Sequence, residues 1–341
     1  MTTILGLLIL TYLIIIGQRF PIIASFNFWS VILLVYCFIA SVIPVNVLLQ
    51  PRDYLSAFLL FFGVGVGFLG ILFSRPDMNI PAFIKTNQPL WPLLFVTVAC
   101  GAISGFHSLV SSGTTSKQLS NEKDAKRIGY GAMILEGGVA LLAVICVASG
   151  LSGYSELLQE KGNPIYIFAK GYASITKPIL KEYGAFIAIT MLNAFILTTL
   201  DTATRIARYI TDEIFYFKNR FFSTFIIVLV IGYLAISGEK TTNLLWQVFG
   251  ASNQLISALA LIVISIWLLS LKKNFLYTLI PAVFMLVTTI AALILQAVKF
   301  FRNNWLLFTI CLVLIFLALF ILFESKMILK KWFFRRINGN R

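Results

Sequence analysis

Residues 303–323 form the stretch NNWLLFTICLVLIFLALFILF, which contains no Asp, Glu, Lys or Arg. An α-helix rises about 1.5 Å per residue and the hydrocarbon layer of a bilayer is about 30 Å thick, so roughly 20 such residues cross it. Nine other charge-free stretches of at least 18 residues precede this one, at 1–18, 20–51, 54–74, 86–116, 137–155, 183–200, 221–238, 241–271 and 274–298. The sequence therefore predicts an all-α, polytopic bundle of about ten transmembrane helices over residues 1–325, followed by a basic tail at residues 326–341.

The composition excludes a soluble globular protein. Of the 341 residues, 59% are hydrophobic and 12% are charged, and the mean hydropathy is +0.93. The net charge of +14 is therefore interpreted loop by loop. Placing successive loops on alternate sides puts 17 Lys and Arg on one side and 10 on the other, four of the ten in a long loop within residues 156–182. Because basic loops stay in the cytoplasm, both termini are predicted to be cytoplasmic, in a plasma (inner) membrane.

The basic tail is predicted to bind membrane lipid. Its six Lys and Arg lie beside Trp332, Phe333 and Phe334, a composition typical of an anchor at the anionic cytoplasmic leaflet. Nucleic acid is not expected as a partner, because such basic tails commonly flank transmembrane helices.

No cofactor, metal site or enzymatic activity is predicted. The four cysteines lie singly in apolar stretches, and the chain has one histidine, so neither a disulfide framework nor a metal cluster is indicated. Motifs of serine hydrolases, zinc proteases and P-loop enzymes do not occur. The enzymatic alternative is an intramembrane hydrolase that uses a serine and His107, for which the sequence offers no recognisable third partner.

Residues 100–117, CGAISGFHSLVSSGTTSK, bring polar groups into an apolar stretch. The spacing of Ser104, His107, Ser108 and Ser111 predicts one helical face that carries hydroxyls and the histidine. Glycines at 101 and 105 predict close approach of another helix. An unwound end that holds a substrate or cation is then predicted from Ser111, Ser112, Gly113, Thr114, Thr115 and Ser116. The alternatives are a helix end capped by Ser and Thr and, for the histidine, a hydrogen bond between helices.

Two other apolar regions carry polar side chains at membrane depth. If a helix begins near Ile128, Glu136 lies about 12 Å below the surface and needs a partner, a proton or a cation. The alternative is a structural ion pair or hydrogen bond. Asn253 and Gln254 need hydrogen-bond partners, and packing between helices is the favoured interpretation there.

Asp201 and Arg205 are four residues apart on a predicted helix, with Thr198 and Thr202 on the same side. The planar guanidinium of Arg205 suits bidentate binding of a carboxylate, so this segment is a candidate substrate site or gate. The alternative is an interfacial salt bridge that fixes a helix end.

Several of these segments resemble one known family. The similar stretches are PV (44–45), LLQPRDYL (48–55), LWP (90–92), ACGAISGFHSLVSSGTTSKQ (99–118), IGYGA (128–132), TLDTATR (199–205) and FGASNQ (249–254). In this order they resemble the carbon starvation protein A (CstA) family of bacterial inner-membrane transporters. The resemblance implies a LeuT-like type of fold with broken helices, and uptake of peptides under carbon limitation, or of pyruvate, driven by a proton gradient.

The family's amino-terminal region, with a Gly-His-His-Phe stretch and Gly-Pro repeats, has no counterpart here. The chain thus resembles the carboxyl-terminal portion of such a protein, and a separate amino-terminal half is a candidate partner.

We therefore expect a secondary transporter of peptides or a small carboxylate, coupled to protons or sodium. The expected substrate or ion path consists of Ser104, His107, Ser108, Ser111, Ser112, Gly113, Thr114, Thr115 and Glu136, and the expected substrate or gate residues are Thr198, Asp201, Arg205, Asn253 and Gln254. The alternatives are a channel and a non-transporting sensor or assembly half of a split transporter.

Overall fold

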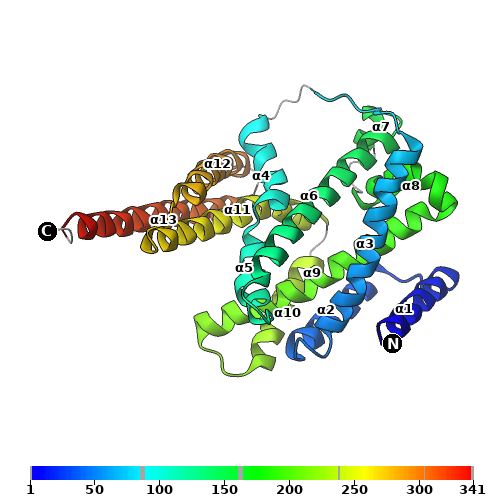
Figure 1. Cartoon of the computed structure of the whole chain (residues 1–341), viewed down its shortest axis with the longest axis horizontal. Helices are drawn as coiled ribbons and strands as arrows, with labels where there is room; N and C mark the ends of the chain where they lie inside the picture. The colour runs from blue at the N-terminus through cyan, green and yellow to red at the C-terminus, as the bar shows by residue number, and fades with distance from the viewer. Residues whose placement is uncertain (1, 85–88, 160–163, 237–238, 303, 339–341) are drawn as a thin grey trace. The chain divides into compact units, whose positions relative to one another are not determined.

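The computed structural model describes residues 2–84, 89–159, 164–236, 239–302 and 304–338, and the chain is helical throughout these ranges apart from its connections. Figure 1 follows the helices along the chain. They are α1 (Thr2–Arg19), α2 (Phe26–Val42), α3 (Leu49–Ser74), α4 (Leu90–Ala102), α5 (Gly105–Gly113), η1 (Thr115–Lys117), α6 (Asp124–Gly150), α7 (Tyr154–Gln159), α8 (Pro164–Leu180), η2 (Lys181–Tyr183), α9 (Gly184–Phe215), α10 (Arg220–Ile236), α11 (Glu239–Ser270), α12 (Leu276–Phe300) and α13 (Trp305–Asn338). The prediction of an all-α fold is confirmed.

Among the described residues, seven helical segments are long and apolar enough to cross a membrane. They are Thr2–Arg19, Leu49–Ser74, Asp124–Gly150, Pro164–Phe215, Val248–Ser270, Leu276–Phe300 and Trp305–Glu324. The shorter apolar helices α2 and α10 cover two further predicted stretches, and residues 86–116 contain two helices, α4 and α5. The chain is therefore a multi-pass helical membrane protein, and the number of ten spans stays a prediction.

The chain divides into two compact units. We call residues 1–84 and 134–236 unit 1, and residues 85–133 and 237–341 unit 2. The predicted boundary between residues 325 and 326 falls inside α13, which continues to Asn338. Residues 339–341 of the predicted tail lie outside the described residues.

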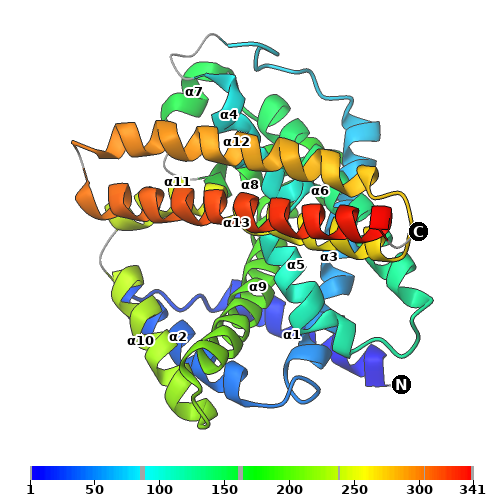
Figure 2. The same ribbon diagram turned by 90° about the vertical axis from the view of Figure 1, so that its left-hand side faces the viewer.

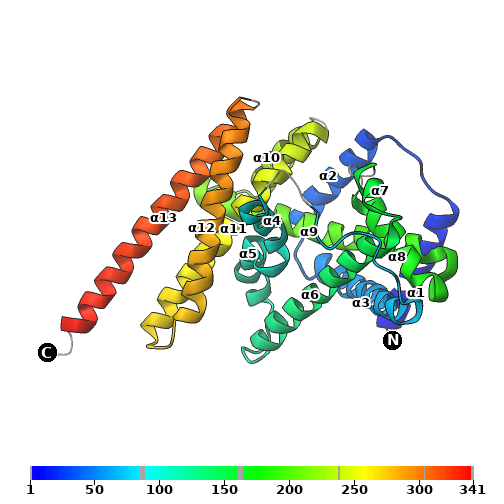
Figure 3. The same cartoon turned by 90° about the horizontal axis from the view of Figure 1, so that it is seen from above.

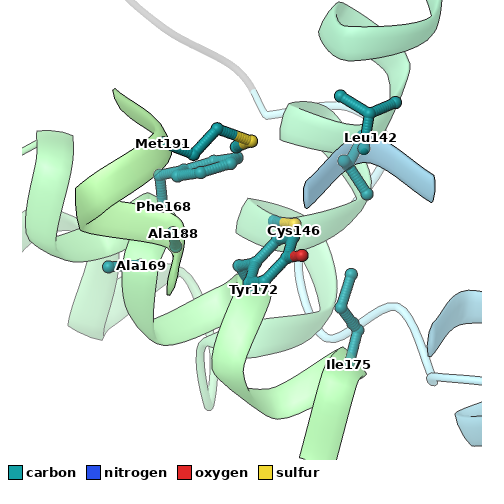
Figure 4. Packing of buried hydrophobic residues seen from close by; sticks show 9 residues of the cluster. Leu142, Cys146, Phe168, Ala169, Tyr172, Ile175, Ala188 and Met191 are labelled. Carbon is teal, nitrogen blue, oxygen red and sulfur yellow. The ribbon is translucent and has the colours of Figure 1, made fainter. Parts of the chain in front are cut away.

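In unit 1, the hydrophobic core is built by α3, α6, α8 and α9 (Figure 4). Its fully buried side chains include Tyr172 of α8, whose hydroxyl donates to the carbonyl of Gly63 on α3 at 2.6 Å. Glycines allow the closest crossing, because a Cβ atom on Gly171 would collide with the backbone of Cys146. Cys37, Cys146 and Cys311 are buried and free, as expected for apolar packing residues.

Helix α8 corrects the prediction of a loop within residues 156–182. One side of this helix is buried in the core through Ile167, Tyr172 and Ile175, whereas Lys177 is exposed. An amphipathic helix of this kind carries charges on its outer side, so a search for charge-free stretches misses it.

In unit 2, α11 packs against α4, α5, α12 and α13. Figures 2 and 3 both show α12 and α13 lying side by side as consecutive antiparallel helices. Buried residues of α11, α12 and α13, such as Ala258, Leu286 and Ala318, form the core between them. This core fixes α11, which carries Asn253 and Gln254.

Candidate functional site

Unit 1 holds a cluster of three charged side chains and one tyrosine, which come from three helices. Asp201 of α9 is fully buried, and its Oδ2 atom accepts hydrogen bonds from the hydroxyl of Tyr36 on α2, at 2.9 Å, and from Nη1 of Arg52 on α3. The Nη2 atom of Arg52 forms an ion pair with Oδ1 of Asp53. One guanidinium thus bridges two carboxylates, and Asp201 holds α2, α3 and α9 together.

The two carboxylates differ in their access to the outside. The Asp201 side chain is 0% exposed, that of Arg52 is 18% exposed and that of Asp53 is 45% exposed. The Nε atom of Arg52 is buried and has no hydrogen-bond partner among the described residues. Asp201 therefore binds the guanidinium from the buried side, whereas Asp53 is the more exposed carboxylate of the cluster.

The predicted pair between Asp201 and Arg205 is wrong. The Nη2 atom of Arg205 instead donates to the carbonyls of Ala40 and Ile43, the latter at 2.6 Å. Arg205 is 3% exposed, and it supplies partners for carbonyls at the carboxyl end of α2, which a helix leaves unpaired. The salt bridge of Asp201 runs to Arg52, so neither the i, i+4 pair nor its interfacial alternative is formed.

The predicted threonines of α9 lie on either side of this cluster. Thr198 is half-buried, and its hydroxyl donates to the carbonyl of Phe195 in its own helix at 2.7 Å. The hydroxyl of Thr202 lies 3.4 Å from Oδ1 of Asp201. Only Thr202 therefore contributes to the charged cluster.

Sequence reasoning missed Tyr36, Arg52 and Asp53 as site residues. Arg52 and Asp53 separate two charge-free stretches, but α3 begins at Leu49 and places both in its first turns. Pro51 is compatible with this position, because the first turn of a helix needs no amide donor there. The sequence signal for these residues is the charged pair Arg52 and Asp53 between two long apolar stretches.

Unit 2 holds a second polar cluster, at a break between two helices. Helix α4 ends at Ala102, and Ser104 has an extended backbone before α5 begins at Gly105. The Asn253 side chain of α11 accepts from the amide of Phe106 at 2.7 Å and donates to the Ser104 hydroxyl at 3.2 Å. A break thus separates α4 from α5 within one predicted span, and Asn253 binds the amide of Phe106 in the first turn of α5.

The neighbouring amide side chain links three helices of unit 2. Gln254 donates to the carbonyl of Phe95 on α4 at 2.9 Å and accepts from the hydroxyl of Thr289 on α12 at 3.3 Å. Asn253 and Gln254 are 3% and 0% exposed. Their geometry matches the favoured interpretation of amides that join helices.

The break lies earlier in the chain than predicted. Ser111, Ser112 and Gly113 belong to α5, and only Thr114 and the turn η1 follow the helix. Ser104 precedes α5 as its N-cap, so it does not share a helical face with His107, Ser108 and Ser111. The hydroxyl groups of Ser108 and Ser112 donate to carbonyls of their own helix, at 2.7 Å and 3.0 Å.

Gly105 permits the predicted close approach of another helix. A Cβ atom there would lie 2.6 Å from Cβ of Ile256 and 2.9 Å from the amide nitrogen of Ser257, both on α11. His107 is exposed, and Thr115 is half-buried. The surroundings of residue 101 lie outside the described part of the chain.

Glu136 lies deeper in its helix than predicted. Helix α6 begins at Asp124, so Glu136 is about 18 Å along the helix axis from its start, and it is half-buried. It belongs to unit 1, whereas Ser104 and Thr115 belong to unit 2. Among the described residues, no group of His, Cys, Asp and Glu has the arrangement of a metal site.

These features define a multi-pass helical membrane protein with ionisable and amide side chains buried between its helices, an arrangement typical of membrane transport proteins. The family model described as Carbon starvation protein CstA matches residues 1–158 and 152–292. The chain therefore belongs to the CstA family.

Relatives in several bacteria agree with this assignment. The peptide transporter CstA of Helicobacter pylori is 32% identical, over 79% of this chain and 50% of that protein. The peptide transporter CstA of Escherichia coli is 32% identical (75% and 48%), and the pyruvate/proton symporter BtsT of the same organism is 31% identical (79% and 50%). The chain spans about half the length of the curated relatives it matches, as expected for a resemblance to one portion of them. No solved structure matches the chain.

Proposed function

We propose that this chain is a secondary transporter of the plasma (inner) membrane that takes up peptides or a small carboxylate such as pyruvate together with protons. The observation that carries the proposal is the buried cluster of Asp201, Arg52 and Tyr36, because charged groups inside a membrane protein are costly and mark substrate or ion pathways. The names of the relatives supply the substrate classes.

Uptake of labelled pyruvate and of a labelled dipeptide by transporter-deficient cells tests this proposal. We expect accumulation that a protonophore abolishes, with the E. coli peptide transporter CstA as positive control. Equilibration without accumulation would indicate a channel. No flux from well-folded, membrane-inserted protein, alone and with the partner described next, would contradict the transport function.

The proposal includes a separate amino-terminal half as partner, because the relatives are about twice as long as the part that matches. Co-expression with the half of the E. coli relative that this chain does not match tests it. Uptake that requires both polypeptides supports a split transporter, and full uptake by the chain alone contradicts it. Cytoplasmic placement of both termini is part of the same proposal and is tested by reporter fusions at each end.

We also propose that residues 111–115 contribute to the substrate or ion path. The hydroxyl oxygen of Thr114 supports this role, because it is buried and has no hydrogen-bond partner among the described residues. Cysteines introduced one at a time from Ser111 to Thr115 should react with aqueous thiol reagents, and substrate should protect them. Lack of reaction at all five positions would contradict the path.

His107 and Glu136 are proposed as groups that carry the coupling proton. A histidine titrates near neutral pH, and a carboxylate in the middle of a transmembrane helix needs a proton or a cation when its partner leaves. Uptake by His107→Gln and Glu136→Gln variants, measured against pH, tests this role. Unchanged proton coupling in both variants would remove it.

A further inference from the structure

The guanidinium of Arg52 has one edge that is only partly used. Its Nη1 atom is engaged by Asp201 and Tyr36, and its Nη2 atom pairs with one oxygen of Asp53 at 2.5 Å. The Nε atom, which lies on the same edge as Nη2, has no hydrogen-bond partner among the residues that the structure describes. This edge is the one at which a guanidinium binds a carboxylate through two parallel hydrogen bonds.

Asp53 occupies this edge with a single bond. A carboxylate that reached both Nε and Nη2 would make one hydrogen bond more than Asp53 does, and it would satisfy a buried donor that is now unpaired. A substrate carboxylate therefore has a structural advantage over Asp53 at this edge. Asp201 and Tyr36 hold Nη1 in either case, so the guanidinium stays in place during the exchange.

Arg205 supplies an independent reason to expect an anion here. It lies one turn after Asp201 on α9 and is 3% exposed, and its Nε atom is also buried and has no partner in the described ranges of the chain. Within the described part of the chain, no carboxylate lies at ion-pair distance from it. Arg205 thus adds a positive charge that no carboxylate neutralises at ion-pair distance within the described residues, so an anion at Arg52 is favoured electrostatically when Asp53 is neutral.

We propose that Asp53 and the carboxylate of the substrate compete for the Nε and Nη2 edge of Arg52, and that a proton on Asp53 releases this edge to the substrate. This inference rests on the proposed transport function and names its substrate class as monocarboxylates, including the carboxyl terminus of a peptide. The proton joins the carboxylate of Asp53, the ion pair between Asp53 and Arg52 breaks, and the substrate carboxylate forms two N–H···O bonds to Arg52. One proton and one negative charge thus enter together.

The groups that face Asp53 come from few elements. On α3 its neighbour is Arg52, α9 contributes Asp201, and α2 contributes Tyr36 through Arg52. Helix α1, which packs against Leu55 through Gly6, has no charged side chain before its last residue and contains Tyr12 as its titratable group. Helix α8 contacts α3 at Gly63, Gly67 and Gly70, and Gly63 lies about 15 Å further along the axis of α3 than Asp53. The carboxylate most open to a proton in this cluster is therefore Asp53.

Binding of pyruvate and of alanylalanine to the purified full-length chain in nanodiscs, measured from pH 5 to pH 8, tests the competition. For the wild type, the dissociation constant should rise about tenfold per pH unit once Asp53 is deprotonated, because each binding event then takes up one proton. Asp53→Asn should bind with a dissociation constant that does not vary with pH, whereas Asp53→Glu should keep the slope. Amides of both ligands, which lack the carboxylate, should not bind.

Matched controls separate this effect from general changes in charge. Asp77→Asn removes another exposed aspartate of unit 1, outside the cluster, and should keep the wild-type slope. Arg52→Lys keeps the charge but lacks the planar two-donor edge, so binding should weaken by at least about tenfold. The thermal denaturation of each variant is compared with that of the wild type, so that loss of folding is recognised.

Different results would contradict the competition for Arg52 and the proposed transport function. If the wild type binds and accumulates either ligand, but Asp53→Asn keeps the pH slope or folded Arg52→Lys keeps the affinity, the competition is wrong and transport stands. If the wild type, alone or with its co-expressed partner half, neither binds nor accumulates either ligand, the proposed function is wrong, and the inference is overturned with it.

Discussion

The contact between α5 and α11 predicts a strong and specific effect of Gly105→Ala. The new Cβ atom would lie 2.6 Å from Cβ of Ile256 and closer still to the carbonyl oxygen of Asn253. Carbon atoms in contact prefer about 3.5–4.0 Å, so the two helices must separate by about 1 Å. Overpacking of this kind costs about 1–3 kcal/mol, and loss of the hydrogen bond from Phe106 to Asn253 adds about 1 kcal/mol.

The total, about 2–4 kcal/mol of unfolding free energy, is measured by denaturation in detergent followed by circular dichroism. Gly129→Ala is the matched control, because Gly129 lies in α6 of the same unit with open space around its Cα atom. Alanine is the better helix former, so this variant should be neutral or more stable by about 0.5–1 kcal/mol. Equal stability of the two variants would refute the close crossing of α5 and α11.

Two further predictions concern unit 1. Asp201→Asn leaves the charge of Arg52 without its buried partner, and we expect a loss of about 3–5 kcal/mol, measured by the same denaturation assay; wild-type stability would contradict the buried ion pair. The hydrogen bonds of Glu156 with Lys170 and Ser152 lower the pKa of Glu156 from 4.5 to about 2. The interaction of Glu156 on α7 with Lys170 on α8 therefore contributes its full stabilisation above pH 4.5, and this contribution is lost as the pH falls through about 2. Peptic cleavage near Ser152 should be faster in Glu156→Gln than in wild type at pH 4.5, and the difference should become smaller as the pH falls to about 2, where about half of the Glu156 carboxylates are protonated; equal rates throughout would contradict it.

The spans could be predicted from sequence because they depend on a local property. A run of apolar residues must be buried or face lipid whatever the rest of the chain does, so the charge-free stretches coincide with helices. Helix α8 shows the limit of this rule. Its lysines indicated a loop, but they lie along a helix whose other side, with Tyr172, is in the core. The period of its apolar residues, rather than the absence of charge, was the informative signal.

The candidate site was predicted less well because its partners are distant in sequence. The spacing of Asp201 and Arg205 predicted a local pair, yet Asp201 pairs with Arg52, which is 149 residues away. The helix break was expected where hydroxyl residues are dense, near Ser111, but it lies at Ser104. At this break, the side chain of Asn253 donates to the Ser104 hydroxyl and accepts from the amide of Phe106. Asn253 is 149 residues from Ser104 in the sequence. Neither partner can be inferred from local spacing.

The polar cluster at the helix break and the charged cluster of unit 1 differ in chemistry, so we expect different roles for them. Amides and hydroxyls, such as Asn253 and Ser104, keep the same protonation state across physiological pH, so their hydrogen bonds fix the geometry of the helix break and do not respond to protons. The cluster of Arg52, Asp53 and Asp201 contains an exposed carboxylate that shares its partner, so it responds to protons and to anions at the same site. Substitutions at Asn253 should therefore weaken the uptake of every substrate alike and leave its pH dependence unchanged. Substitutions at Asp53 should mainly change the pH dependence of uptake, because the proton on Asp53 and the substrate carboxylate act on the same guanidinium, that of Arg52.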